Sequence, residues 1–224
     1  MRMRLWITAI VASLWGAAWC QAEDLLFEDA FDKELSARWK VVGLTKEDYR
    51  VRNGGLELRA RAVKRGDPAP MLKVDLPFTT DDTVIASVEV SVIGEALPRG
   101  AYAGLTLTDE DGSVFTVRKT NIDGYFVFAP GEVEFIGQPG QEGDPSNFTV
   151  KYWPAKPEAG PLRIILRGPY AHAQVGPSFT GQYKTFFYSA IQEAKAGLGF
   201  GLVAIQSPTD GEHWVRFDNF RVRK

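Results

Sequence analysis

A chain of 224 residues with 26 basic and 28 acidic side chains has a formal net charge of −2. This mild acidity argues against nucleic acid as a partner, because nucleic-acid-binding domains carry a strongly basic face. Hydrophobic residues make up 45% of the sequence, enough for a sizeable core, and the single cysteine excludes an intramolecular disulfide. The composition therefore indicates one folded domain that is held together by its own core.

The first 22 residues have the pattern of a secretory signal peptide. Arg2 and Arg4 form a basic start, and an apolar stretch follows over residues 5–19. Small or tolerated residues then lead to a cleavage position after Ala22. We expect cleavage at this position and a secreted or periplasmic protein, with a leader typical of bacteria.

Two other fates of this leader are open. An uncleaved anchor helix would hold the protein on the membrane, although the apolar stretch is short for a bilayer span. A lipoprotein would be cut before Cys20, although Trp19 then stands where a small residue is wanted. No second apolar run is long enough to span a membrane. We therefore expect residues 23–224 to form a single soluble exported domain.

Apolar and polar residues alternate with a period of two through most of the chain, as in antiparallel strands with one buried face. The clearest strand covers residues 83–93, where Val84, Ala86, Val88 and Val90 share one face. Shorter alternating runs lie around residues 56–59, 105–108, 125–128 and 162–167. The pattern predicts an all-β protein.

Turn sequences separate these runs at short intervals. They are Asn53-Gly54-Gly55, Asp111-Gly112, Asp123-Gly124, residues 137–140 and Asp210-Gly211. Many short strands with regular turns favour an antiparallel β-sandwich of two packed sheets, or a barrel, over alternating strands and helices.

The two ends of the chain after the leader share a pattern. Residues 25–32 lead to Trp39, and residues 214–222 close the chain; in both segments aromatic side chains bracket carboxylates. Such ends suit a β-sandwich of the jelly-roll type whose first and last strands meet. Acidic side chains would then gather at the point where the strands meet.

The last of these segments contains a change of phase. Val215 and Phe217 share one parity, whereas Phe220 and Val222 share the other. Burial of all four side chains requires a β-bulge near Asp218-Asn219. Such a bulge either turns Asp218 toward a ligand or ion, or is a tolerated irregularity of an edge; both interpretations stay open.

These patterns resemble those of the concanavalin A-like lectin/glucanase domains, which are laminin-G-like jelly rolls. The matching segments are 28–39, 55–58, 104–112, 162–168, 197–201 and 217–222. The resemblance implies an antiparallel jelly roll and a role with carbohydrate. The opening segment is more distantly similar to the 3-keto-disaccharide hydrolase-like domain, from which no catalytic residue can be carried over.

Laminarinase-type glucanases of this fold use a Glu-x-Asp-x-x-Glu strand motif, in which one carboxylate attacks and another donates a proton. The sequence lacks this motif. Its nearest pair is Glu132 and Glu134, which share a strand face about 7 Å apart, near the separation in retaining glycosidases. Because the pair follows a turn signal at Pro130-Gly131, a solvated acidic face is the alternative.

The resemblance also implies a structural cation where the two ends meet. In the glucanase relatives an acid near the first strand and the aspartate of the last strand hold this ion, which here implies Glu28 or Asp29 together with Asp218. Such oxygen ligands suit Ca²⁺, with backbone carbonyls and water completing about six to eight ligands. Ordinary surface acids are the alternative. The acidic segment 109–112 lacks the spacing of an EF-hand loop and predicts a solvated turn.

A ligand-binding face is the remaining candidate site. If the strands around residues 147–153, 160–168 and 170–176 lie in one sheet, parity places six side chains on its outer face: Trp153, Arg163, Arg167, Tyr170, His172 and Gln174. Aromatic rings offer an apolar surface to sugar C–H groups, and the polar groups bind hydroxyls or carboxylates. A solvent-exposed sheet face, with Trp153 packed under a loop, is the alternative.

The sequence therefore predicts an exported, non-catalytic carbohydrate-associated module that binds a glycan or polysaccharide through this face. A glycoside or 3-keto-disaccharide hydrolase is one alternative, and a structural or adhesive cell-envelope protein is the other. Apart from the implied structural Ca²⁺, no cofactor is predicted.

Overall fold

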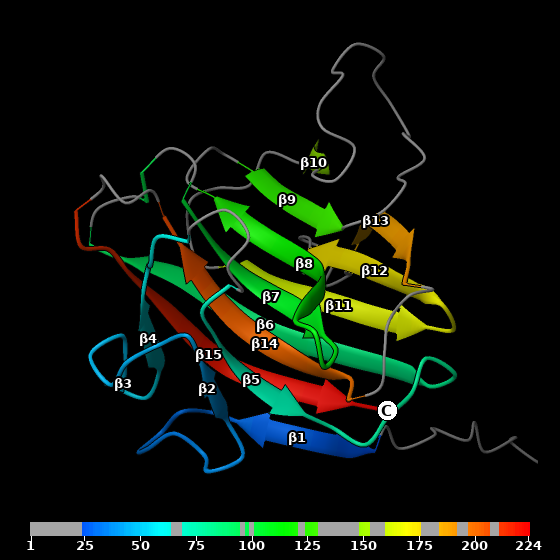
Figure 1. Cartoon of the computed structure of the whole chain (residues 1–224), viewed down its shortest axis with the longest axis horizontal. Coiled ribbons are helices and arrows are strands. Elements are labelled where there is room, and N and C mark those ends of the chain that lie inside the picture. The colour runs from blue at the N-terminus through cyan, green and yellow to red at the C-terminus, as the bar shows by residue number, and fades with distance from the viewer. Residues whose placement is uncertain are drawn as a thin grey trace, which may run out of the picture.

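The computed structural model describes residues 24–63, 69–94, 97–98, 101–120, 124–129, 148–152, 160–175, 184–191, 197–206 and 211–224. These residues form fifteen β-strands and no helix (Figure 1). The strands belong to two antiparallel sheets that pack face to face. The predicted antiparallel β-sandwich of the jelly-roll type is thus confirmed.

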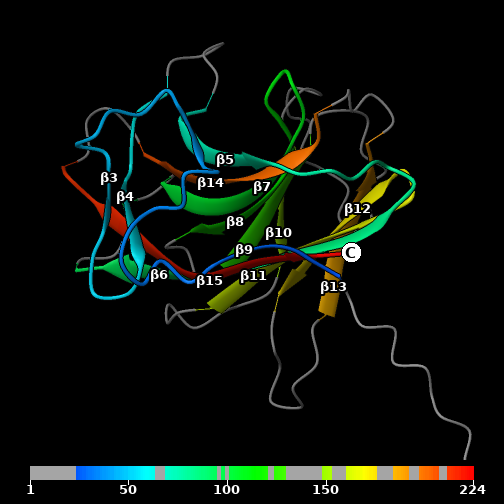
Figure 2. The same cartoon turned by 90° about the horizontal axis from the view of Figure 1, so that it is seen from below.

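The strands are named in chain order and divide between sheet I and sheet II. Sheet I has the order β13 (Lys184–Ala190), β12 (Tyr170–Val175), β11 (Gly160–Arg167), β6 (Thr83–Ile93), β15 (Trp214–Arg223), β4 (Leu56–Arg59) and β3 (Tyr49–Val51), with β1 (Leu25–Asp29) also paired to β15. Sheet II has the order β10 (Phe148–Tyr152), β9 (Gly124–Ala129), β8 (Ser113–Thr120), β7 (Tyr102–Thr108), β14 (Gly199–Ile205), β5 (Met71–Asp75) and β2 (Lys40–Val42). Figure 2 shows the two layers, with β5, β14 and β7 in one and β15, β6 and β11 in the other.

Inward-facing side chains of the two sheets form one hydrophobic core. On β6, which has the predicted bounds, Val84, Ala86, Val88 and Val90 are buried. Sheet II contributes buried side chains from three neighbouring strands: Leu105, Leu107, Phe115, Val117, Phe200 and Leu202. Removing this apolar surface from water is the main favourable term in folding, at about 25 cal/mol per Å².

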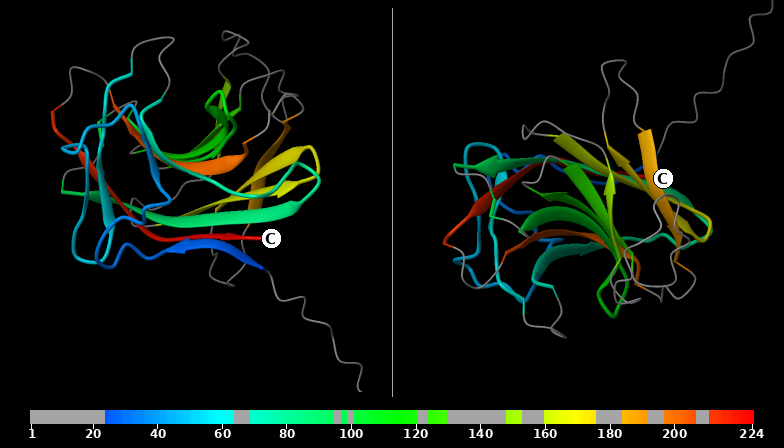
Figure 3. Two further views of the ribbon diagram at one scale, coloured as in Figure 1. Left: turned by 60° about the horizontal axis from the view of Figure 1, so that its bottom comes forward. Right: turned by 90° about the horizontal axis from the view of Figure 1, so that it is seen from above.

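The first and last strands meet, as the similar ends of the chain predicted. β1 pairs with β15 in antiparallel register, with Leu25 opposite Arg223 and Asp29 opposite Phe220 (Figure 3). The Trp39 ring lies against Phe220, with 5.0 Å between ring centroids. Aromatic side chains from both ends of the chain therefore pack into one corner of the core.

The predicted β-bulge in the last strand is confirmed. The register between β15 and β6 shifts between Asp218 and Arg221, and Asn219 has a left-handed backbone with φ of 53°. Asparagine tolerates this conformation better than most residues. The shift lets Val215, Phe217, Phe220 and Val222 all become fully buried although their parities differ.

The predicted signal peptide, residues 1–22, lies outside the described residues and stays a prediction. Within the described ranges, no helix has the length and hydrophobicity that crossing a bilayer would require.

Candidate ligand-binding face

Five of the six residues predicted for the ligand face lie together on the outer surface of sheet I. Arg163 is opposite Gln174, and Arg167 is opposite Tyr170, across the β11–β12 hairpin. His172 is opposite Ile165, between these two pairs. The alternate residues on both strands, among them Leu162, Ile164, Leu166, Ala171 and Ala173, are buried in the core. Parity therefore predicted the orientation of β11 and β12.

The strand around residues 148–152 does not belong to this face. β10 pairs with β9 in sheet II, with Lys151 opposite Phe126, so the expectation that all three strands share one sheet is wrong. Period-two alternation shows which residues share a strand face, but it does not show which sheet a strand joins. Trp153 itself lies outside the described residues.

Tyr188 on β13 completes the cluster and was not predicted. It lies opposite His172 in the register of β12 and β13. The two rings are stacked, with centroids 5.6 Å apart, and Tyr170 meets the Tyr188 ring edge-on at 6.1 Å. Tyr188 is 51% exposed and Tyr170 is 42% exposed, so these rings present apolar surface to solvent. We call Arg163, Arg167, Tyr170, His172, Gln174 and Tyr188 the arginine–aromatic face.

The electrostatics of this face keep His172 neutral at pH 7. Burial lowers the pKa of the imidazole below its ordinary value of 6.5, and the positive charge of Arg167 lowers it further. A neutral imidazole has one N–H donor and one acceptor nitrogen, so it can pair with hydroxyl groups in either direction.

The rows of this face continue across the sheet onto β6 and β15. One row runs from Arg223 through Ile85, Ile165 and His172 to Tyr188. Its central members are apolar or aromatic and only partly buried. The arginines of β11 lie in the rows on either side, so a charged position flanks the apolar row on each side.

The three carboxylates predicted as calcium ligands have separate partners. Asp29 accepts a hydrogen bond from the Trp39 indole at 2.8 Å and another from the Phe31 amide at 2.9 Å. Glu28 accepts one from Arg221 at 2.6 Å. Asp218 accepts one from Arg216 at 2.8 Å.

Among the described residues, no group of three or more His, Cys, Asp or Glu side chains could hold a metal ion. The carboxylates at the meeting ends therefore accept hydrogen bonds from indole, amide and guanidinium donors, and the calcium site stays a prediction. The candidate catalytic pair, Glu132 and Glu134, lies outside the described residues.

The acidic turn after β7 is solvated in part: Glu110 and Asp111 are exposed as predicted, whereas Asp109 is not. The Asp109 side chain is buried, with 6% of the residue exposed. Its Oδ1 accepts hydrogen bonds from the amides of Asp111 and Gly112, at 2.9 and 3.1 Å. The Asp109 carbonyl accepts a further bond from Lys73 Nζ at 2.6 Å. This aspartate caps a tight turn because its short side chain reaches the backbone two and three residues on.

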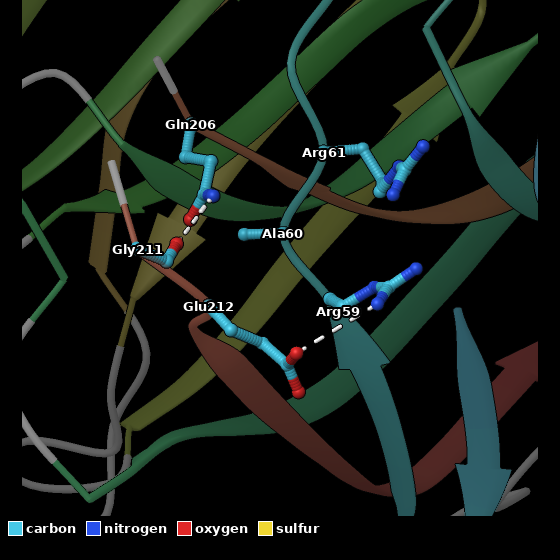
Figure 4. A pocket seen from close by; sticks show the side chains of 6 residues that line it. All are labelled: Arg59, Ala60, Arg61, Gln206, Gly211 and Glu212. Carbon is cyan, nitrogen blue, oxygen red and sulfur yellow. Dashed lines mark hydrogen bonds and ion pairs between the residues drawn. The ribbon is translucent and has the colours of Figure 1, made fainter. Parts of the chain in front are cut away.

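A hollow of about 250 Å³ lies where β4 ends, lined by Arg59, Ala60, Arg61, Gln206, Gly211 and Glu212 (Figure 4). The neighbouring carboxylate of Asp48 is 1% exposed. Its Oδ1 accepts hydrogen bonds from Arg59 Nε and Nη2 at 3.0 and 2.6 Å and lies 3.4 Å from Arg61 Nη1. The charges of both arginines are therefore engaged by a carboxylate of the protein itself.

The same segment joins the two sheets. The Arg61 amide donates to the Ala204 carbonyl at 3.0 Å, and the Gln206 amide donates to the Arg61 carbonyl at 3.1 Å. We interpret this hollow and its ion pairs as a structural joint between the end of β4 and the end of β14.

The outer face of sheet II carries buried polar groups, some of which contact one another. Arg118 stacks on Tyr102, with its guanidinium carbon 4.0 Å from the ring centroid. Burial raises the pKa of Tyr102 and lowers that of Arg118. Thr116 donates a hydrogen bond to Thr106 at 2.9 Å, and both threonines are buried. The arginine–aromatic face, by contrast, presents the exposed rings of Tyr170 and Tyr188 beside the exposed Arg167.

Comparison with known proteins yields similarity of structure and not of sequence. No protein-family model matches the chain, and no curated protein matches it. The structure is similar to a xylan β-1,4-xylosidase from Bacillus halodurans C-125, with a TM-score of 0.67 and 14% identity. That match covers 88% of this chain and 39% of the xylosidase, so the chain spans well under half of it.

Two further structures match over nearly their whole length. The catalytic domain of an endo-1,3-β-glucanase (laminarinase) from Thermotoga petrophila RKU-1 has a TM-score of 0.58 and 14% identity, covering 90% of this chain and 98% of that one. A functionally unknown protein from Saccharomyces cerevisiae has a TM-score of 0.59 and 14% identity, covering 83% and 95%. At these identities the likeness shows that the chain has the jelly-roll fold of these proteins.

Proposed function

We propose that the protein is an exported glycan-binding module whose binding surface is the arginine–aromatic face. The observation that carries this proposal is the exposed cluster of Tyr170, His172 and Tyr188 beside two arginines on one flat side of sheet I. Aromatic rings pack against the C–H surfaces of sugars, and guanidinium and imidazole groups hydrogen-bond to hydroxyls. This combination suits a carbohydrate better than a purely apolar ligand.

The structural neighbours support a carbohydrate ligand. One of them is named as a xylosidase and another as a laminarinase, so the fold is found in proteins that act on polysaccharides. Because a shared fold hosts many activities, the role of this chain has to be argued from its own side chains. Those side chains offer a surface for binding, and we propose no catalytic step.

Export follows from the predicted signal peptide at residues 1–22. We propose that the chain acts outside the cytoplasm, where polysaccharides are accessible. Fractionation of cells that produce the full chain would test this: the protein should appear in the periplasm or medium without its first 22 residues. Recovery of the uncleaved chain in the cytoplasm would contradict it.

Titration of the purified protein with a panel of oligosaccharides tests the binding role. Isothermal titration calorimetry should show saturable binding of at least one oligosaccharide. Tyr188→Ala should weaken this binding about tenfold, because it removes an exposed ring of the cluster. The matched control is Val41→Ala, which shortens a 42% exposed side chain on sheet II and should leave the affinity unchanged.

Two results would overturn the proposal. Equal affinities of the Tyr188→Ala and wild-type proteins would remove the face from the binding role. Release of new reducing ends from the same oligosaccharides by wild-type protein would show that the role is catalytic.

A further inference from the structure

We infer that the arginine–aromatic face selects a polysaccharide that carries repeated negative charges, such as carboxylates or sulfate esters. This inference rests on the proposed function, because it names the class of glycan that the same face binds. It follows from the distribution of charge over sheet I, from the spacing of the arginines and from the apolar row between them.

The strands β11, β12 and β13 contain no aspartate or glutamate, although acidic residues outnumber basic ones in the whole chain. Two arginines on β11, Arg163 and Arg167, point to the outer face. On the neighbouring part of the sheet, Arg221 and Arg223 of β15 continue the rows of Ser87 and Ile85. These four arginines outnumber Glu89, an exposed acidic residue on the same side of β6, although Arg221 also donates a hydrogen bond to Glu28.

Three acidic residues of sheet I lie toward its other edge and have partners there, whereas Glu89 of β6 is exposed opposite Pro161 of β11. Glu57 accepts a hydrogen bond from Arg50 at 2.5 Å, Asp218 from Arg216 at 2.8 Å, and Glu28 from Arg221 at 2.6 Å. Charges in that half are thus balanced by ion pairs. The half formed by β11 and β12 has the guanidinium groups of Arg163 and Arg167 beside aromatic rings, and their positive charge favours an anionic ligand there.

Arg167 is the side chain on which an anion would act most directly. It is exposed, it lies two residues after Ile165, which is opposite His172, and its charge disfavours protonation of that imidazole. A carboxylate or sulfate bound to Arg167 would offset this repulsion. Guanidinium groups bind such anions with two parallel hydrogen bonds, so Arg167 should bind a carboxylate or sulfate more tightly than a hydroxyl group.

The spacing of the two arginines favours a chain of sugars over a single one. Arg163 and Arg167 are four residues apart on β11, so their Cα atoms are about 13 Å apart. Ile85, Ile165, His172 and Tyr188 form the apolar row between their positions. An oligosaccharide that crosses this row can rest its C–H surfaces on the rings while its charged groups reach the arginines on both sides.

A matched pair of ligands tests the inference. Hexagalacturonate carries six carboxylates, and its fully methyl-esterified form has the same sugars without the charges. We expect the wild-type protein to bind the acid at least about tenfold more tightly at low salt, with the advantage shrinking as salt is raised because the charges are exposed. Dextran oligosaccharides with and without sulfate esters form the second arm, which distinguishes sulfate from carboxylate recognition.

Variants at charged positions give the second readout. Arg167→Gln should reduce the affinity for hexagalacturonate about fivefold and that for the methyl ester by a clearly smaller factor, because only the hydrogen bonds to neutral groups are lost there. Arg167→Lys should recover part of the loss. The control is Lys46→Gln, which removes the same charge from an exposed turn before β3, at the opposite edge of sheet I. It should leave both affinities unchanged.

The pKa of His172 provides a further readout. It would not change on ligand binding if Arg167 only stabilised the fold. Binding of hexagalacturonate should raise the pKa of the His172 imidazole, measured by NMR, and binding of the methyl ester should not. The residues facing this imidazole are Ile165 and Arg167 of β11, Tyr170 and Gln174 of β12 and Tyr188 of β13, so no carboxylate of these strands competes with the ligand.

The outcomes separate this inference from the proposed function. If acid and ester bind equally and Tyr188→Ala weakens both, the face binds glycan but the charge selection is wrong. If the protein binds neither the galacturonate ligands nor the dextran ligands, charged or uncharged, both proposals fail. If poly-glutamate or single-stranded DNA of equal charge binds as tightly as hexagalacturonate, the face attracts polyanions in general and the assignment to a glycan is wrong.

Discussion

The imidazole of His172 stacks on the ring of Tyr188, with 5.6 Å between the centroids and 27° between the planes. Because Tyr188 is half exposed, this contact covers one face of the imidazole and leaves aromatic surface open to solvent. The pKa of His172 is therefore expected to respond to whatever covers the aromatic centre of the arginine–aromatic face.

Arg167→Gln is expected to raise the pKa of His172 in the free protein. Burial lowers that pKa first, and the Arg167 charge lowers it further, so removal of the charge reverses the second cause only. The value should rise but stay below 6.5. NMR titration of the imidazole protons measures it. Arg221→Gln, on the same sheet, serves as the control, and an unchanged pKa in Arg167→Gln would contradict the assigned cause.

Asp48→Asn is expected to destabilise the protein by about 3 kcal/mol, because two arginines lose a buried carboxylate. Burial raises the pKa of Asp48, but hydrogen bonds from the Thr45 amide and the Arg59 guanidinium outweigh it and hold the pKa below 3.8. The carboxylate thus contributes stability above pH 3.8, and this contribution is lost as pH falls through the lower folded pKa. Denaturation with urea at pH 7 and pH 3 measures both effects. Equal stability of wild type and variant at pH 7 would contradict the prediction.

Lys119→Met is expected to stabilise the protein at pH 7 by roughly 2 kcal/mol. The lysine is 4% exposed, donates to the Val90 carbonyl of the opposite sheet at 3.1 Å, and has a pKa lowered by burial from 10.5 to about 8. Replacement with a hydrophobic side chain of similar length removes the cost of burying the charge, which a shift of this size puts at about 3 kcal/mol, less one hydrogen bond.

The pH dependence of the Lys119 effect has a definite sign. Between pH 8 and 10.5 the unfolded chain binds a proton that the folded chain has released, so stability of the wild type rises with pH in this window. The Met variant lacks this rise, and its advantage should shrink from pH 7 to pH 10. An advantage that grows with pH would show that the lysine is not held with a lowered pKa.

Two glycine-to-alanine substitutions are expected to differ in cost. At Gly199 an added Cβ would overlap the backbone carbonyl of Val74 on the paired strand, which cannot move without breaking the sheet, so about 3 kcal/mol or more should be lost. At Gly55 the added Cβ would meet the side-chain ends of Asp218 and Arg216, which can rotate away, so about 1 kcal/mol should be lost. Thermal and urea denaturation rank the two variants, and the reverse order would contradict this account.

The bulge at Asp218-Asn219 could be predicted because it follows from local parity. Four apolar side chains of alternating phase had to share one core, and a shift of register is the way a strand achieves this. The face of β11 and β12 could be predicted for the same reason, since the two strands follow one another in a short hairpin.

The placement of β10 and the part played by Tyr188 could not be predicted from parity. β10 joins β9 in sheet II across a long stretch of chain, and alternation within a strand does not specify its neighbour. Tyr188 follows two phenylalanines, so three consecutive aromatic residues hide which parity is outward. Lys119 shares the parity of Phe115 and Val117 and is buried like them. Its burial could not be predicted because a lysine in a strand usually faces solvent.

The position of β15 within sheet I has a consequence for how the protein folds. This strand is the last element of the chain, yet it lies between β6 on one side and β4 and β1 on the other. Without β15, sheet I would consist of three unjoined pieces: β1, the β3–β4 pair, and the strands β6, β11, β12 and β13. Joining these pieces depends on contacts between residues far apart in the sequence, such as Leu25 with Arg223, which makes folding slow.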